Sequence, residues 1–140
     1  MSPIDRQLIT RKAGLVQKDL AKLEKYKGVS LSEYEKSDEV QLAVERLIER
    51  IVSRMIDINY HVLKEEFNLM PTDYHDSFIE LGAKEVLPRE FSQELAKSAG
   101  LRNALAHEYD QIDHKSVHAS IVIALSEVPR HLKSILDFIG

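Results

Sequence analysis

The sequence predicts an all-α fold, a bundle of four to five helices. Apolar side chains recur at steps of three and four residues along several stretches, as they do in amphipathic helices, and no stretch has the strict alternation of a half-buried strand. The composition agrees, since only five Gly, four Pro and no Trp accompany 30% charged residues. At 140 residues we expect one domain, residues 1–140, able to bury a core of its own.

The first helix is predicted after Pro3 and should end near Gly28, because glycine commonly closes a helix in the left-handed conformation. The segment from Ser30 to Glu33 then supplies residue types found in turns and helix caps. The apolar stripe of this helix consists of Ile9, Ala13, Val16, Leu20 and Leu23.

A long second helix is predicted from Ser37 or Asp38, either of which can be its N-cap. Two neighbouring apolar stripes run along it, so its apolar arc is too wide for a simple surface helix. We therefore expect it to be central to the bundle or shared with a partner. The stripes contain Val40, Val44, Leu47, Ile51, Met55, Ile58 and Val62, and Ile48, Val52, Ile56 and Leu63.

Prolines and aspartates delimit the remaining helices. A short third helix follows Asp73 and closes before Pro88, which begins the fourth. A last helix follows Asp113 as N-cap, and Pro129 should kink or split it because an interior proline removes a backbone hydrogen bond. The apolar positions are Phe78, Ile79 and Leu81, then Phe91, Leu95, Ala99, Leu101 and Leu105, and finally Val117, Ile121, Ala124, Val128, Leu132, Ile135 and Ile139.

The charge balance argues against a protein that coats nucleic acid. There are 19 Lys and Arg against 23 Asp and Glu, giving a formal charge of -4, so any contact with RNA must be local. Cysteine is absent, which rules out disulfides and thiolate zinc sites. No uncharged apolar run has the length of a membrane span and no secretory signal is recognisable, so we expect a cytoplasmic protein.

The stretch ending at Tyr109 brings together groups suited to phosphodiester chemistry. Arg102 can hold a phosphate, and His107 can move a proton near neutral pH. At 100° per residue these two side chains, Asn103 and Tyr109 share one half of the helix surface. Asn103 lies one turn before His107 and can orient its ring.

Cleavage of RNA by its own 2'-hydroxyl works best with a base and an acid, whereas one such helix supplies a single imidazole. A twofold dimer could place two copies of the helix around one phosphate. We expect His107 to act as acid or base, Arg102 to stabilise the charge on the phosphorus oxygens and Asn103 to orient. No metal or other cofactor is required. The small residues Ala96 and Ala99 would permit a close helix contact, within the subunit or across a dimer.

The string from Arg102 to Tyr109 resembles the Arg-x4-His-x-Tyr signature of the HepT-like toxins, which belong to the HEPN superfamily of all-helical ribonucleases. The similarity extends over nearly the whole chain. It includes Ala43–Ile48 and the long helix over Ile51–Glu65, the segment Asp76–Leu81, and Leu87-Pro88 ahead of the motif helix.

The resemblance implies a homodimeric HEPN-like bundle whose two motifs line an RNA cleft, acting as a metal-independent endoribonuclease toxin of a type VII-like toxin–antitoxin pair. It also implies a partner, a nucleotidyltransferase antitoxin of the MNT class that transfers AMP from ATP to the motif tyrosine, here Tyr109. AMP beside Arg102 would add bulk and negative charge where the substrate phosphate binds, so the adenylylated protein should be inactive.

The alternative function is a non-catalytic HEPN module that binds or regulates a nucleotidyltransferase. The four motif residues favour the enzyme, because a purely structural helix needs none of them. Asp110, just beyond the motif, either extends the polar edge of the cleft or caps the helix.

Two other groups of residues have competing interpretations. His114 and His118, with Asp110 or Asp113, could form part of a metal site, but solvated histidines with Asp113 as a cap are the favoured interpretation. Three further histidines have no clustered partners in the sequence, so we expect them on the surface: His61, His75 and His131.

A run of Arg46, Arg50 and Arg54, spaced four residues apart, could track an RNA backbone. The interleaved Glu45 and Glu49 favour instead an exposed helix with salt bridges along its surface.

Overall fold

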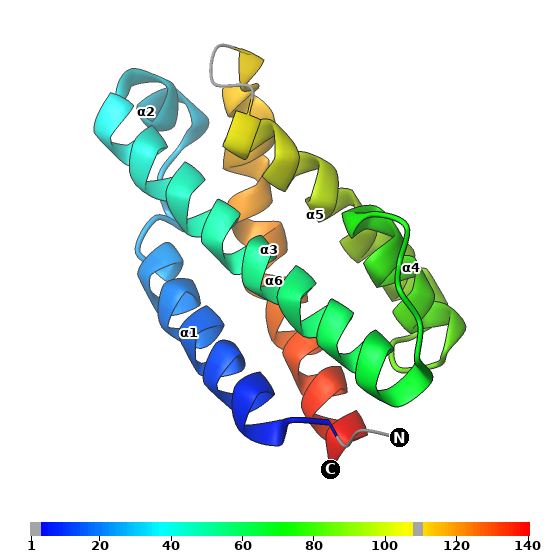
Figure 1. Cartoon of the computed structure of the whole chain (residues 1–140). Coiled ribbons are helices and arrows are strands. Elements are labelled where there is room, and N and C mark those ends of the chain that lie inside the picture. The colour runs from blue at the N-terminus through cyan, green and yellow to red at the C-terminus, as the bar shows by residue number, and fades with distance from the viewer. Residues whose placement is uncertain (1–3, 108–110) are drawn as a thin grey trace.

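The computed structural model describes residues 4–107 and 111–140, and these residues form helices without any strand (Figure 1). The helices are α1 (Arg6–Glu24), α2 (Leu31–Lys36), α3 (Asp38–Phe67), α4 (Tyr74–Ala83), α5 (Arg89–His107) and α6 (His114–Ile139). The predicted all-α class is confirmed, with one short helix more than expected. None of the helices in the described part is both long and apolar enough to cross a membrane.

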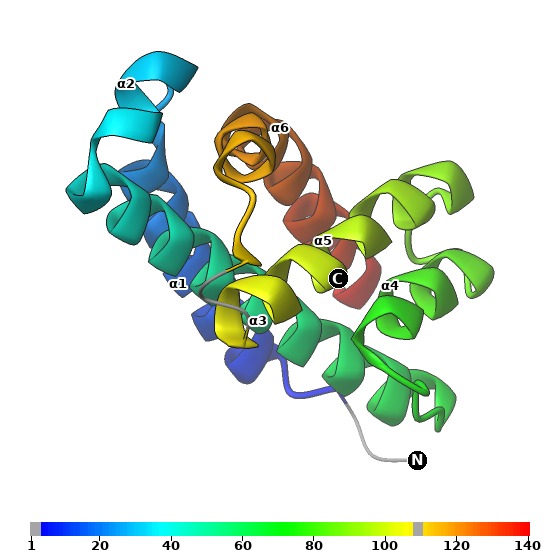
Figure 2. The same ribbon diagram turned by 90° about the horizontal axis from the view of Figure 1, so that it is seen from above.

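Helix α3 is the centre of the bundle, and each of the other five helices packs against it. Both of its predicted apolar stripes are buried almost throughout, with Val40 only partly covered. Of the two expectations for this helix, a central position within the subunit is therefore the one observed. In the view from above, α4 and α5 lie side by side along one part of α3 (Figure 2).

The first helix buries the whole predicted stripe but ends earlier than expected. Its C-cap is Lys25, which has a right-handed conformation, so the prediction of a left-handed end at Gly28 was wrong. Residues between α1 and α2 form turns, and a capping box between Ser30 and Glu33 then begins α2. The Gln41 amide of α3 donates to the Tyr34 carbonyl over 2.9 Å and fixes the end of α2.

The predicted starts of the later helices are confirmed. Asp73 caps α4, Asp113 caps α6 and α5 begins directly after Pro88. Helix α6 continues through Pro129, so this proline does not split it. Helices α4 and α5 approach closely at Gly82, where any side chain would collide with Ser92.

His131 is fully buried, so the prediction that it lies on the surface was wrong. It occupies the apolar stripe of α6, which faces α3 and α1. Its Nε2 lies 2.7 Å from the Asn59 side-chain oxygen, and the Asn59 amide donates to Ser77 over 3.2 Å. This hydrogen-bonded set joins α6, α3 and α4 inside the core. Burial lowers the pKa of His131 to about 3, because an apolar interior disfavours the charged imidazole.

The buried imidazole should make stability depend on pH. In the unfolded chain His131 takes a proton near its ordinary pKa of about 6.5, whereas the folded protein keeps it neutral to about pH 3. The unfolded state therefore binds more protons across this window, and the free energy of unfolding falls as the pH drops, by up to about 1.4 kcal/mol per pH unit. Urea unfolding across the window measures this slope.

The matched control is His131→Gln, whose amide can still donate to Asn59 but cannot titrate. Its unfolding free energy should decline less steeply with falling pH than that of the wild type. Parallel curves for the two proteins would contradict the assignment.

Candidate functional site

The motif occupies the last turns of α5, and His107 is the final residue of this helix. The Arg102 side chain is half-buried, whereas Asn103 and His107 are exposed. Tyr109, the predicted modification site, and Asp110 lie outside the described residues.

Two helices other than α5 fix the guanidinium of Arg102. Its Nε donates to the Ser53 hydroxyl of α3 over 3.0 Å. Its guanidinium carbon also lies 5.4 Å from the centre of the Tyr74 ring, at the start of α4, in a cation–π contact. The cation is therefore held in place before any ligand arrives. Ser53 and Tyr74 were not predicted as part of the site, because both contacts join residues far apart in the chain.

Asn103 is directed toward this cation. Its side-chain oxygen accepts a hydrogen bond from Arg102 Nη1 over 3.3 Å. An orienting function for Asn103 would thus act on the guanidinium, rather than on the His107 ring as the helical spacing suggests. The guanidinium turns toward α3 and α4, while the imidazole lies exposed at the helix end.

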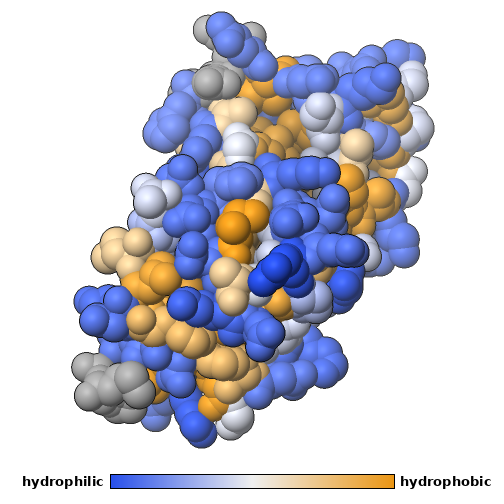
Figure 3. All heavy atoms as spheres, turned by 90° about the vertical axis from the view of Figure 1, so that its right-hand side faces the viewer, coloured by the Kyte–Doolittle hydropathy of each residue, from blue (hydrophilic) through white to orange (hydrophobic). Residues whose placement is uncertain are grey.

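A mainly apolar groove of about 390 Å³ lies beside the motif helix, between α5 and α6, with residues of α3 at its floor. Figure 3 shows apolar surface in a hollow bordered by polar side chains in the upper half of the molecule. On α6, Ile123 lines the groove and is 50% exposed, and Val122 beside it is 53% exposed. Ala96 and Ala99 are buried in their own subunit, so the small residues serve a contact within the chain.

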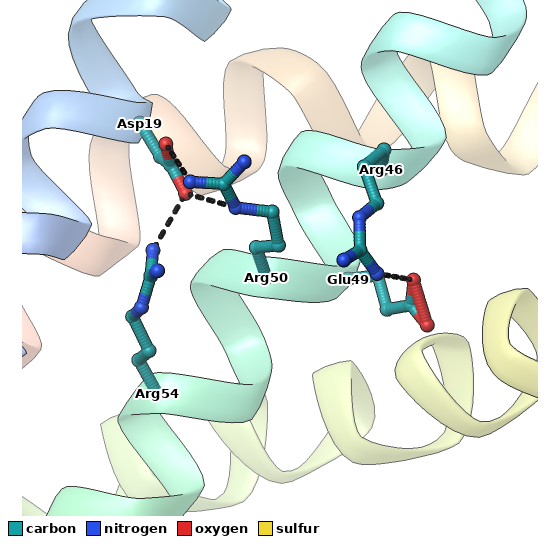
Figure 4. A network of polar contacts seen from close by, with 5 residues as sticks. All are labelled: Asp19, Arg46, Glu49, Arg50 and Arg54. Atoms are coloured by element: carbon teal, nitrogen blue, oxygen red, sulfur yellow. Dashed lines mark hydrogen bonds and ion pairs between the residues drawn. The ribbon is translucent and has the colours of Figure 1, made fainter.

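The three arginines of α3 are engaged in ion pairs (Figure 4). Arg50 and Arg54 both bind the Asp19 carboxylate of α1, with shortest distances of 3.1 and 2.8 Å. Arg46 pairs with Glu49 over 2.9 Å. The arginines are thus salt-bridged as predicted, but only Arg46 pairs with an interleaved glutamate of the same helix, whereas Arg50 and Arg54 are half-buried and bind Asp19, which is only 1% exposed. Because the guanidiniums of Arg50 and Arg54 already bind this carboxylate, they are not free to bind an RNA phosphate.

The two histidines at the start of α6 also have partners within the fold. His118 Nε2 lies 2.6 Å from the Val29 carbonyl oxygen, and His114 Nδ1 lies 3.7 Å from a Glu45 carboxylate oxygen. Both imidazoles contact the buried Tyr34 ring, and burial raises the pKa of its hydroxyl. Among residues 4–107 and 111–140, no three His, Cys, Asp or Glu side chains are grouped so that they could hold a metal ion.

Comparison with protein families gives a match over residues 16–135 to the family described as ribonuclease HepT-like. The chain belongs to the HepT-like family. Its fold agrees, since a Shewanella oneidensis HEPN toxin, solved in a tri-AMPylated form with its MNT antitoxin, superposes with a TM-score of 0.83. That match has 21% sequence identity and covers 93% of this chain and 97% of the toxin.

Two curated members of the family are similar along nearly their whole length. The tRNA nuclease HepT of Aphanizomenon flos-aquae is 36% identical, over 99% of this chain and 95% of its own. The mRNA nuclease HepT of Shewanella oneidensis is 24% identical, over 94% of this chain and 93% of its own. Both relatives thus match the chain from the first helix to the last.

The Asp19 ion pairs should be important for stability. Asp19→Ala would leave two guanidiniums, each still partly covered by protein, without their carboxylate, and we expect it to lower the free energy of unfolding by about 3 kcal/mol. Glu49→Ala, which removes the exposed pair with Arg46, should cost less than about 1 kcal/mol. Urea unfolding of the two variants measures both; equal losses would contradict a structural function of the Asp19 pairs.

Proposed function

We propose that this protein is an endoribonuclease toxin that cleaves RNA without a metal ion through Arg102, Asn103 and His107. The observation that supports this most strongly is the Arg102 guanidinium, which Ser53 and Tyr74 hold in place, on the same helix as the exposed imidazole of His107. A fixed cation suits the charge that develops on a phosphate during cleavage, because it needs no reorganisation in the transition state. Membership in the HepT-like family, with curated relatives named as nucleases, supports the same assignment.

The reaction is an attack of the RNA 2'-hydroxyl on the adjacent phosphorus. One His107 imidazole accepts the hydroxyl proton as the new P–O2' bond forms. The P–O5' bond breaks, and a second imidazole, in its protonated form, gives a proton to the departing 5'-oxygen. Arg102 stabilises the negative charge on the non-bridging oxygens, and Asn103 keeps the guanidinium in place. The products are a 2',3'-cyclic phosphate and a 5'-hydroxyl.

This scheme uses two imidazoles, and each chain supplies one from its motif, so the site we propose is formed by a homodimer. The apolar side chains along the outer face of α6, with Val122 and Ile123 most exposed, lie beside the motif helix and offer a surface for a second copy. A twofold contact through this face would bring the two α5 helices toward each other. Arg102 and His107 of both copies could then line one cleft.

We propose tRNA as the first substrate to test, because the relative described as a tRNA nuclease is the more similar of the two, at 36% against 24% identity. The partner we propose is an MNT-type nucleotidyltransferase antitoxin, as in the Shewanella oneidensis complex. It would inactivate the toxin by adenylylating Tyr109, which follows His107 by two residues in the sequence.

Removal of the imidazole should abolish cleavage. We expect His107→Ala to lower the rate of RNA cleavage by about 10²- to 10⁴-fold, the usual contribution of a general acid or base, without changing the melting temperature. The wild type should cut RNA equally well in EDTA and leave 2',3'-cyclic phosphate ends, which chromatography of the products detects.

Two results would contradict this assignment. Loss of wild-type cleavage in EDTA would refute the metal-independent mechanism. Equal growth and intact RNA in cells that express either the wild type or His107→Ala without a partner would favour the non-catalytic binding module.

The tyrosine should be the point at which the antitoxin acts. Tyr109→Phe cannot accept AMP, so in cells that also contain the nucleotidyltransferase it should be more toxic than the wild type. Mass spectrometry should find added AMP on the wild type and none on the variant. Equal protection of both proteins by the antitoxin would remove Tyr109 from the proposal.

A further inference from the structure

The cation of the motif lies against an aromatic ring that is still partly open to solvent. Tyr74, the first residue of α4, is 40% exposed although the Arg102 guanidinium covers part of its ring. Structural support of Arg102 does not require an exposed ring. Unpaired RNA bases commonly stack on exposed aromatic side chains and on arginine guanidinium planes.

A second aromatic ring supports the first. Tyr60 of α3 lies edge-on to Tyr74, with ring centres 6.0 Å apart and planes at 82°. It is half-buried, and burial, followed by the nearby charges of Tyr74, Asp73 and Asp76, raises the pKa of its hydroxyl. A phenol of ordinary pKa, about 10, is already uncharged at neutral pH, so the Tyr60 ring itself does not repel a phosphate.

The position of Tyr74 is fixed from the core side as well. The Ser77 hydroxyl donates to the Tyr74 carbonyl over 2.7 Å, and Ser77 accepts from the Asn59 amide, which His131 contacts in turn. The Asp73 cap closes the same helical turn, with its carboxylate accepting from the Asp76 amide over 2.7 Å. These bonds fix the backbone of Tyr74, and the contacts with Arg102 and Tyr60 hold its ring, so the ring loses little conformational freedom when a flat ligand stacks on it.

We propose that Tyr74, supported by Tyr60, stacks one nucleobase of a single-stranded RNA next to the phosphate that Arg102 binds. This inference rests on the proposed function and adds a base-binding subsite to it. A guanidinium and an exposed ring in direct contact match the two parts of a nucleotide, since the cation suits the phosphate and the ring suits the base. Every base has a flat face, so the subsite selects an unpaired nucleotide more than a particular sequence.

The test uses His107→Ala as background, so that bound RNA stays intact. The probe is a single-stranded oligonucleotide that spans the position cut by the wild type, together with versions lacking one base on either side of that position. Fluorescence anisotropy at constant salt gives each Kd. Tyr74→Leu should weaken binding of the complete oligonucleotide by about 5- to 150-fold, the range for loss of one stacked base, whereas Tyr74→Phe should bind nearly as the background protein does.

The deciding comparison is between oligonucleotides. On the version that lacks the stacked base, Tyr74→Leu should cost clearly less than on the complete oligonucleotide, because only the contact with Arg102 is lost there and nothing remains to stack. Leu15→Ala, on α1 and 39% exposed, is the matched surface control and should change neither Kd. An equal loss on all oligonucleotides, with a weaker dependence on salt, would show that Tyr74 only positions Arg102 and would overturn the proposal.

A second measurement leaves Tyr74 intact. The fluorescent base 2-aminopurine is placed at successive positions of the oligonucleotide, and its fluorescence should be quenched on binding at one position next to the cleaved phosphate. If the fluorescence is quenched at no position, the subsite is also overturned. If the wild type neither binds nor cuts RNA, the proposed function fails and the subsite fails with it. If the wild type binds and cuts RNA but the Tyr74 effects are absent, only the subsite fails.

Discussion

The structure depends on the burial of one 30-residue helix, α3, against all five others. Its two apolar stripes fill the core, and several of its polar side chains bind residues of neighbouring helices. Arg50 and Arg54 hold Asp19 of α1, Ser53 holds Arg102 of α5, and Asn59 binds Ser77 of α4 and His131 of α6. Buried polar groups need partners, so these pairs set the positions of the helices around α3 in a way that apolar contacts alone do not.

The same helix explains why Arg102 is held in place in the proposed site whereas His107 is exposed. Ser53 lies two turns before Tyr60, so one side of α3 contacts the Arg102 guanidinium and also contributes Tyr60, which packs against Tyr74. The guanidinium is therefore preorganised, which is the property that makes electrostatic catalysis effective. His107, by contrast, is exposed at the end of α5, and in our proposal a second copy of the chain completes its surroundings.

Local patterns predicted most of the fold. Apolar periodicity gave α1, α3, α5 and α6, and single capping residues such as Asp73 and Asp113 gave helix starts, because these signals lie within a few residues of each other. Helix α2 is too short for periodicity, although its Ser30–Glu33 capping box was readable. Asp19 and His131 both occupy apolar stripes, a sign of burial, but their partners lie 31 or more residues away. Ser53 and Tyr74 beside the motif had no local signal at all.

The central claim is that two chains share one reaction site. Its most direct test is a mixed dimer of wild type and His107→Ala, purified through a different affinity tag on each chain and assayed for RNA cleavage. If the two imidazoles act on one phosphate as base and acid, the mixed dimer should be nearly as inactive as the His107→Ala homodimer. Half the wild-type activity would show that each chain works alone and would contradict the account.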